Sequence, residues 1–388
     1  MGIQSLLKMT AFLLLLVFLP IEAAGQERRI AILGDSLGTG GAAHPDLHFD
    51  SQVLYEIFSG RKTLVPRPED LLTLRQEGVL SSDQSLVTPT RLEISRREFD
   101  GSINWVGKHT LNAFSRQYLD FEEYSWGNLL GLSLKIPPPQ IEIAAEDGAR
   151  MKAVHRQLDR LLDQNAQLPE HVFLFFTGND VCGPSGDFVT TAEDYGLQLQ
   201  RGLRYLARNG KPGASGTHVW VMDPVGVMQL VTSDAIQNKS VKAHGRTMTC
   251  RELQKGLGPK LEETLAAGDL QQPEKVYFLQ MFPRSPADYC PTVFGRGFDR
   301  EPQDVQQMIA NRIRDYRREI QDSVVVLREQ GKKDPRFAGF SFHHVPDTGL
   351  LVFGPDDIAE DCFHLALRGQ LKVAKAVLAA MEREKALF

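Results

Sequence analysis

Two short apolar segments, each followed by a glycine and polar residues, most constrain the fold of this chain. Residues 29–33 precede Gly34-Asp35-Ser36-Leu37, and residues 172–177 precede Gly178-Asn179-Asp180. Short, continuous apolar runs of this kind are typical of strands that are buried on both faces of a parallel sheet. Because the carboxyl ends of parallel strands meet at one edge of the sheet, we expect Ser36 and Asn179 to lie close together there.

The remaining pattern alternates between strands and helices. Further strands are predicted at 218–222, 275–280 and near 340–343, and helices at 144–165, 191–209, 303–329 and 365–382. This alternation predicts an α/β fold with a central, mostly parallel sheet in one domain, residues 26–388. Two long stretches, at about 39–139 and 228–273, are predicted to be insertions that wall or cover a site at the sheet edge.

A third motif, Asp361-Cys362-Phe363-His364, lies just before the last predicted helix. A serine hydroxyl is a poor nucleophile at neutral pH and needs a base, most often histidine, whose far ring nitrogen is held by a carboxylate. Ser36, His364 and Asp361 supply these groups, and the amide of Asn179 could donate to a developing oxyanion. Taken singly, each motif also suits a plain turn or a helix N-cap, so the prediction depends on their occurring together.

These motifs resemble those of the GDSL, or SGNH, hydrolases, and most closely the phospholipase B-like branch. The resemblance to the branch lies in Gly178-Asn179-Asp180-Val181-Cys182 and in Asp361-Cys362-Phe363-His364, where cysteines extend the general motifs. Residues 99–105 and 111–114 loosely resemble the segment after the first block, and the likeness runs from Ile30 to about Leu378.

The resemblance implies a flavodoxin-like three-layer α/β/α fold and serine-dependent hydrolysis of acyl esters. It implies that Ser36 is the nucleophile, His364 the base and Asp361 its partner. The oxyanion would be bound by Ser36, Asn179 and a glycine that is best matched by Gly127. Phospholipids or lysophospholipids are the implied substrates, which would bring the protein into transient contact with a membrane surface.

Two alternatives to a lipid esterase remain open at this stage. One is an acetyl esterase of carbohydrates on the same fold, and the other is a binding protein that kept the fold without turnover. A net charge of −5 without a basic stripe argues against a nucleic-acid partner. We expect neither a cofactor nor a metal, and the sequence indicates no oligomeric state. Four arginines on the helix predicted at 303–329 are interpreted as its solvent face, with a phosphate headgroup as the alternative ligand: Arg312, Arg314, Arg317 and Arg318.

Residues 1–25 have the pattern of a secretory signal peptide, in which Lys8 precedes an apolar run that is too short to span a bilayer. A secreted location would allow disulfides among the four cysteines, which can pair in three ways. Because Cys182 and Cys362 each lie within three residues of a predicted site residue, we predict the pairs Cys182–Cys362 and Cys250–Cys290. The alternative is that these cysteines are free and buried.

Overall fold

The computed structural model describes residues 28–47, 53, 56, 57, 61–92, 120–176, 178–183, 188–243, 245–256, 285–295 and 301–387. Several expectations fall outside these residues. They are the signal peptide at 1–25, the segments 99–105 and 111–114, Thr177, the strand at 275–280, and parts of both insertions.

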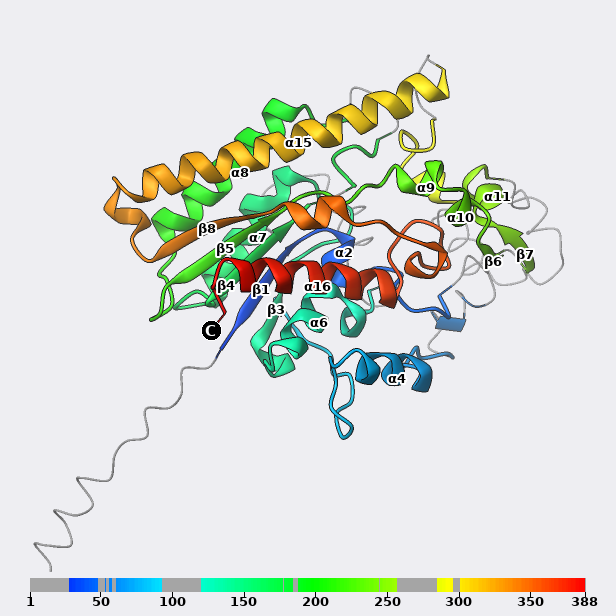
Figure 1. The fold of residues 1–388 in the computed structure, drawn as a ribbon, viewed down its shortest axis with the longest axis horizontal. Coiled ribbons are helices and arrows are strands. Elements are labelled where there is room, and N and C mark those ends of the chain that lie inside the picture. Colours follow the sequence, from blue (N-terminus) through cyan, green and yellow to red (C-terminus); the bar gives the residue numbers. More distant parts are fainter. Residues whose placement is uncertain are drawn as a thin grey trace, which may run out of the picture.

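A six-stranded parallel sheet forms the centre of the protein (Figure 1). Its order is β2 (Thr90–Arg91), β3 (Ile141–Ile143), β1 (Ile30–Gly34), β4 (His171–Phe175), β5 (Thr217–Met222) and β8 (Phe340–Val345). Every pairing between neighbours in this sheet is parallel. The expected α/β fold with a mostly parallel sheet is therefore confirmed.

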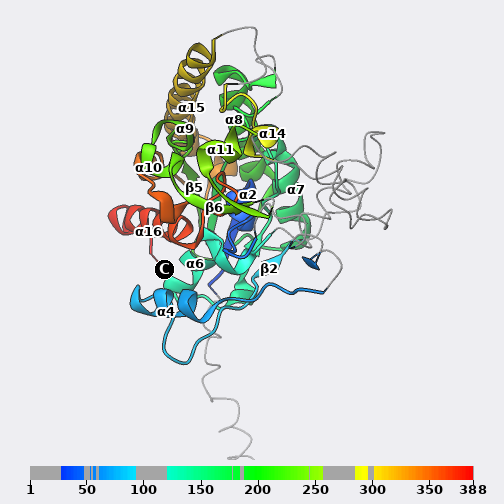
Figure 2. The same cartoon turned by 90° about the vertical axis from the view of Figure 1, so that its right-hand side faces the viewer.

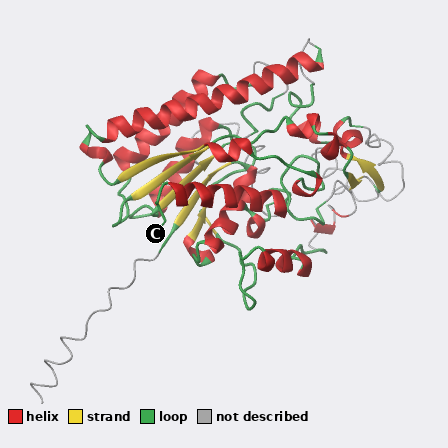
Figure 3. Cartoon of the chain, viewed as in Figure 1, coloured by secondary structure: helices red, strands yellow, loops and turns green. Residues whose placement is uncertain are grey.

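Helices cover both faces of the sheet (Figure 3). The core on one face contains α6 (Trp126–Ser133) and α16 (Leu367–Arg383), and the core on the other contains α7 (Val154–Gln164), α8 (Ala192–Asn209) and α15 (Pro302–Gly331). Successive residues of β1 alternate between these cores, as a strand requires: Ile30 and Ile32 face the first, and Ala31 and Leu33 the second. The apolar positions that predicted α15 are buried, including Ile309, Tyr316 and Leu327.

The chain passes from β1 to β3 on one side and then from β3 to β4 on the other. Ile30 accordingly pairs with Ile141 on one side and with His171 on the other. The direction of winding reverses at β1, and in open α/β sheets ligands bind beyond the carboxyl end of the strand at such a point. Ser36 lies at that place in the fold.

The helix expected at 144–165 is wrong in its first half, because α7 begins only at Val154. Residues 144–150 instead form a loop after β3, a strand that the sequence pattern does not predict. Gly148 in this loop has a φ of +68°, a conformation that a right-handed helix cannot contain. The other predicted helices are confirmed within two or three residues at each end, as α8, α15 and α16.

The second insertion carries a small unit of its own. It contains α9 (Gln229–Thr232), α10 (Asp234–Gln237), the hairpin of β6 (Ser240–Ala243) and β7 (Arg246–Thr249), and α11 (Cys250–Gln254). Figures 1 and 2 place this unit beyond the carboxyl end of the sheet, in front of α2 (Ser36–Thr39). The described residues also include the helices α4 (Pro68–Gln76) and α14 (Pro286–Tyr289). Short 3₁₀ turns lie at Glu122–Tyr124, Pro138–Gln140, Met151–Ala153, Pro335–Phe337, Pro346–Leu350 and Pro355–Asp357.

The predicted disulfide pairing is wrong. The bonds are Cys182–Cys290 and Cys250–Cys362, with Cα–Cα distances of 4.4 and 5.4 Å. Cys182 and Cys290 belong to the large core that contains α8 and α15, whereas Cys250 and Cys362 share a separate small core with the hairpin. Nearness to a site residue along the chain did not determine which way each side chain points. Two disulfides are compatible with an extracellular or periplasmic protein.

Among the described residues, no helix is both long and apolar enough to cross a bilayer. His343 hydrogen-bonds to His218 (2.9 Å), and His344 hydrogen-bonds to Asp223 (2.7 Å). His343 lies buried within β8.

Candidate functional site

Ser36 is fixed in place by the way β1 ends. Gly34 has a φ of +146°, and a Cβ there would lie 2.1 Å from the carbonyl oxygen of Phe175, so only glycine fits. The side-chain amide of Gln157 accepts from the Gly34 N–H and donates to its carbonyl, both at 2.8 Å. Asp35 then caps α2, so that Ser36 is the first residue of that helix.

His364 and Asp361 lie on a tight loop that precedes α16. An isolated β-bridge between Ile358 and Leu365 closes this loop. The Ser36 hydroxyl donates to His364 Nε2 over 3.1 Å, and His364 Nδ1 donates to Asp361 Oδ2 over 2.5 Å. Groups 328 positions apart in the sequence thus meet at one site, and the expected convergence is confirmed.

The electrostatics of this pair favour an ionised carboxylate beside the ring. Burial acts to raise the pKa of Asp361, but the charge of His364 and hydrogen bonds from His364 and Phe363 together lower it below its usual value. Burial likewise acts to lower the pKa of His364, yet the carboxylates of Asp361, Asp147 and Asp35 raise it overall. An ionised Asp361 can only accept, so it holds the proton on Nδ1 and leaves Nε2 to receive the serine proton.

Asn179 occupies the turn after β4. The carboxylate of the following residue, Asp180, holds this turn by accepting from the Met151 N–H (2.8 Å) and the Thr190 hydroxyl (2.7 Å). Asn179 is half-buried and lines the same pocket as Ser36 and His364. Within the described part of the chain its side-chain amide has no hydrogen-bond acceptor.

The pocket beside Ser36 is mainly apolar. Most of its walls come from Leu37, Val225, Val227, Leu230, Phe353, Ile358, Phe363 and Leu365. Its cavity volume is about 40 Å³, whereas a single water needs roughly 10–15 Å³ on this scale. The pocket therefore suits a narrow apolar group, and the sequence did not reveal which residues would form it.

The structure does not bring Gly127 to this pocket. Gly127 is buried where α6 packs on β1, and a Cβ there would lie 2.5 Å from Ile32 Cγ1. The small residue therefore serves the close approach of helix and strand, and Gly127 is not among the residues that line the pocket. The sequence match was misleading because a glycine needed for packing looks the same as one needed for catalysis.

A different glycine, Gly148, lies on the loop that crosses the end of β1. The N–H groups of Ala145 and Glu146 donate to the carbonyls of Ile32 (3.1 Å) and Gly34 (3.1 Å), which fixes the loop against the strand. Gly148 is exposed, its N–H has no acceptor among the described residues, and a Cβ on it would meet nothing within 4 Å. The signal that could have found it is the short run 141–145, which is followed by Glu146-Asp147-Gly148, since this is a third strand with polar residues and a glycine after it.

A pair of carboxyl groups contacts Thr39, which lies one helical turn after Ser36. Thr39 Oγ1 is 3.1 Å from the Ser36 carbonyl oxygen, 3.0 Å from Asp120 Oδ1 and 2.8 Å from Asp147 Oδ1. A hydroxyl has a single hydrogen and cannot donate to three oxygens at once, so a proton on one of the carboxyl groups would supply a second hydrogen bond in this cluster. Burial, together with the charge of Asp147, raises the pKa of Asp120 to about 8, although Arg91 opposes this rise.

Neither the known protein-family models nor the curated proteins include a match to this chain. Among the described residues, no cluster of three or more histidine, cysteine or acidic side chains is arranged to hold a metal ion.

Proposed function

We propose that this protein is a secreted serine esterase of the GDSL/SGNH type, which hydrolyses carboxylic acyl esters through an acyl-enzyme on Ser36. The observation that supports it most is the unbroken chain of hydrogen bonds from Ser36 through His364 to Asp361, at the sheet edge where α/β folds bind ligands. The order β3-β1-β4-β5-β8 is also that of flavodoxin-like sheets, which supports the proposed fold family.

In the first half of the proposed reaction, Ser36 Oγ attacks the ester carbonyl carbon and its proton moves to His364 Nε2. The carbonyl oxygen becomes an oxyanion, which receives hydrogen bonds from the Asn179 amide and from the backbone N–H of Ser36. The N–H of Gly148 is the proposed third donor, because the preceding residue, Asp147, contacts Thr39 within the helix that begins at Ser36. The intermediate collapses, the alcohol leaves with the proton from His364, and the acyl group remains on Ser36. Asp361 stabilises the imidazolium throughout.

In the second half, a water molecule attacks the acyl-enzyme and gives its proton to His364. The tetrahedral intermediate that forms then releases the carboxylic acid, and Ser36 recovers its hydrogen from His364. This sequence uses only groups of this chain and water, so it requires no cofactor.

The acyl part of the substrate would occupy the apolar pocket next to Ser36, which supports an acyl lipid such as a phospholipid or lysophospholipid. The narrowness of the cavity favours a second candidate, an esterase of short acyl groups such as the acetyl groups of carbohydrates. A binding protein without turnover is less well supported, because it would have no use for a hydrogen-bonded serine, histidine and aspartate.

A small fluorophosphonate probe tests the proposal. We expect covalent labelling at Ser36 in the folded protein, and no labelling of Ser36→Ala or His364→Ala variants that melt at the same temperature as the native chain. An unlabelled Ser36 in folded native protein would overturn the proposed function. Hydrolysis of phospholipids, triglycerides and acetylated sugars then separates the two enzyme candidates. Secretion is tested separately: mass analysis of exported protein locates the N-terminus that remains after removal of the predicted signal peptide.

A further inference from the structure

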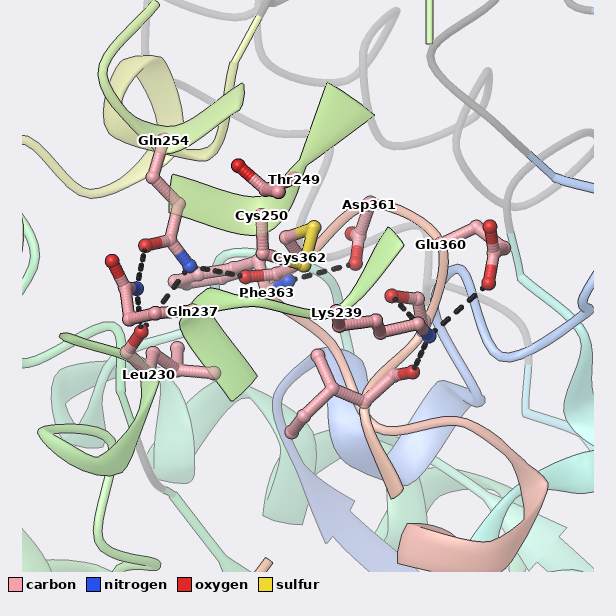
Figure 4. The surroundings of a disulfide bond; sticks show 12 residues. Leu230, Gln237, Lys239, Thr249, Cys250, Gln254, Glu360, Asp361, Cys362 and Phe363 are labelled. Carbon is pink, nitrogen blue, oxygen red and sulfur yellow. Dashed lines mark hydrogen bonds and ion pairs between the residues drawn. A yellow bond between two sulfur atoms is a disulfide. The ribbon is translucent and has the colours of Figure 1, made fainter. Parts of the chain in front are cut away.

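The small unit of the second insertion binds the loop that carries Asp361 and His364 at its tip, which is Cys362 (Figure 4). Cys362, between the two predicted catalytic residues, is bonded to Cys250. The side-chain amide of Gln254 donates to the Cys362 carbonyl over 3.0 Å. Both Cys250 and Cys362 are fully buried, so this end of the loop is enclosed.

Lys239 binds the same loop from the other side (Figure 4). Its ammonium group donates to the carbonyls of Ile358 and Ala359, the latter over 3.3 Å, and lies 3.1 Å from the carboxylate of Glu360. These three acceptors match the three hydrogens of an ammonium group. Only 14% of the Lys239 side chain is exposed, so this contact is partly shielded from water.

The tip of the loop has a conformation that needs such support. Cys362 has a φ of +57°, in the left-handed region, where a residue with a side chain is less stable by roughly 1–2 kcal/mol. This turn lets Asp361 Oδ1 accept from the N–H groups of Phe363 (3.0 Å) and His364 (2.9 Å), which fixes the carboxylate against the ring. Strained conformations persist only where surrounding contacts hold them.

The contacts of the insertion are themselves firmly held. Gln237 Nε2 donates to the side-chain oxygen of Gln254 and to the carbonyl of Leu230, and both glutamines are buried. Leu230 in turn lines the apolar pocket. The insertion therefore links the wall of the pocket to the loop that carries the base.

We propose that Lys239, Cys250 and Gln254 are positioning residues that keep Asp361 and His364 aligned with Ser36. This inference depends on the proposed function, and it gives the insertion a role beyond that of a wall or lid. If the tip relaxed, the contact between Asp361 and His364 would loosen first, since the turn at Cys362 joins them. A displacement of about 1 Å in a catalytic group can cost 10²-fold in rate.

The test compares Lys239→Met with Lys239→Arg and with a control, Lys242→Met, an exposed lysine on the adjacent strand β6. The measurement is the second-order rate of Ser36 labelling by a small fluorophosphonate as a function of pH, which needs no knowledge of the substrate. We expect Lys239→Met to label about 10–100-fold more slowly. Lys239→Arg should recover most of the rate, and Lys242→Met should match the native chain.

The pH profile separates positioning from a general loss of structure. In the native protein Asp361 raises the pKa of His364, so labelling should fall at a pH above 6.5, the ordinary value for histidine. In Lys239→Met this acid limb should move to lower pH, because the ring loses part of its carboxylate contact. Variants that were merely less folded would label more slowly with the limb unmoved, and that result would overturn the inference.

The disulfide provides a second, independent variant. Cys250→Ser combined with Cys362→Ser should slow labelling and shift the acid limb in the same direction, with thermal unfolding used to select a temperature at which the variant is folded. Native labelling rates in both this variant and Lys239→Met would exclude a positioning role. If the native protein itself did not label at Ser36, the proposed function would fail first, so the two failures are distinguishable.

Discussion

The charge of His364 sets the first prediction at the level of single residues. Its imidazole must be neutral to accept the Ser36 proton, and neighbouring carboxylates raise its pKa above 6.5. As the pH falls through this raised value, the ring takes up a proton. The rate of ester hydrolysis should therefore reach half of its neutral value at a pH above 6.5, and it should vanish in acid. The check is kcat/KM against pH with any ester that the protein cleaves. A rate that stays flat from neutral to acid pH would contradict the role of His364.

Replacing Asp361 by asparagine should shift the acid limb of this pH–rate profile. Without the carboxylate, burial becomes the dominant influence and lowers the pKa of His364, so the acid limb should shift to lower pH. The rate at neutral pH should also fall, by about 10³–10⁴-fold, because the ring loses its preferred tautomer. Asp356→Asn is a suitable control, since Asp356 is an exposed carboxylate that precedes the loop of Asp361 and His364 in the sequence.

The carboxyl pair beside Thr39 gives a prediction about how stability depends on pH between 3.8 and about 8. The folded protein keeps a proton on Asp120 up to about pH 8, whereas the unfolded chain releases it near pH 3.8. The folded state therefore binds more protons across this window, and the contribution to stability declines as the pH rises through about 8. Asp120→Asn should flatten this decline in denaturant unfolding measured at several pH values. An unchanged decline in Asp120→Asn would show that the pair does not share a proton.

Among the elements, the end of β1 is the least tolerant of change. Gly34→Ala would push a methyl group into the carbonyl of Phe175, so we expect a loss of about 2–4 kcal/mol in unfolding free energy and of Ser36 labelling. Gly78→Ala is the matched control: Gly78 also has a positive φ, +73°, but open space around it. Gly78→Ala should lower the unfolding free energy by only about 1–2 kcal/mol, because a residue with a side chain is less stable in the left-handed conformation. Equal losses in the two variants would contradict this account.

The sequence was sufficient for elements whose apolar pattern is strong. The continuous runs predicted β1 and β4, and the apolar spacing predicted α15 to within a few residues. It was insufficient for β3, because three residues with Glu142 in the middle are too few to show a strand pattern. Because β3 is not recognisable from the sequence, the predicted helix at 144–165 also starts too early, before α7 begins at Val154.

The same limits apply to the site. Ser36, Asn179, Asp361 and His364 could be placed together because each follows, or precedes, a recognisable element at one sheet edge. Gly148 could not be singled out as a candidate without β3, and Gly127 could not be excluded without knowing that α6 packs on Ile32. Disulfide pairing depends on the direction of side chains, which sequence spacing does not encode.

Across the whole molecule, a row of histidines makes stability sensitive to acid. His171, His218 and His343 lie on the neighbouring strands β4, β5 and β8, with the first two rings 5.2 Å apart and the last two hydrogen-bonded at 2.9 Å. Burial, aided by the neighbouring histidines, lowers the pKa of His171 to about 3 and that of His343 to about 4. Burial also lowers the pKa of His218. These side chains are therefore neutral in the folded protein under mildly acidic conditions.

In the unfolded chain the same histidines take up protons near pH 6.5. The unfolded state then binds more protons, so the free energy of unfolding should fall as the pH drops from about 6.5 towards 4. His218→Gln should make this fall less steep, while His155→Gln, at an exposed position, should not. Denaturant unfolding at each pH measures both, and equal slopes in the two variants would contradict the prediction.

Acid should therefore inactivate the protein in two separable ways. Protonation of His364 should stop labelling of Ser36 reversibly while the near-ultraviolet spectrum stays native, because that proton does not disturb the sheet. Uptake of protons by the histidine row should act at lower pH and unfold the chain, since its members must leave their buried positions to become charged. If His218→Gln shifted the unfolding midpoint to lower pH but left the labelling limb in place, the two groups would act independently, as their separation in the fold requires. A labelling limb that moved together with the unfolding midpoint would show that activity is lost only through unfolding, and His364 would then not be the titrating base.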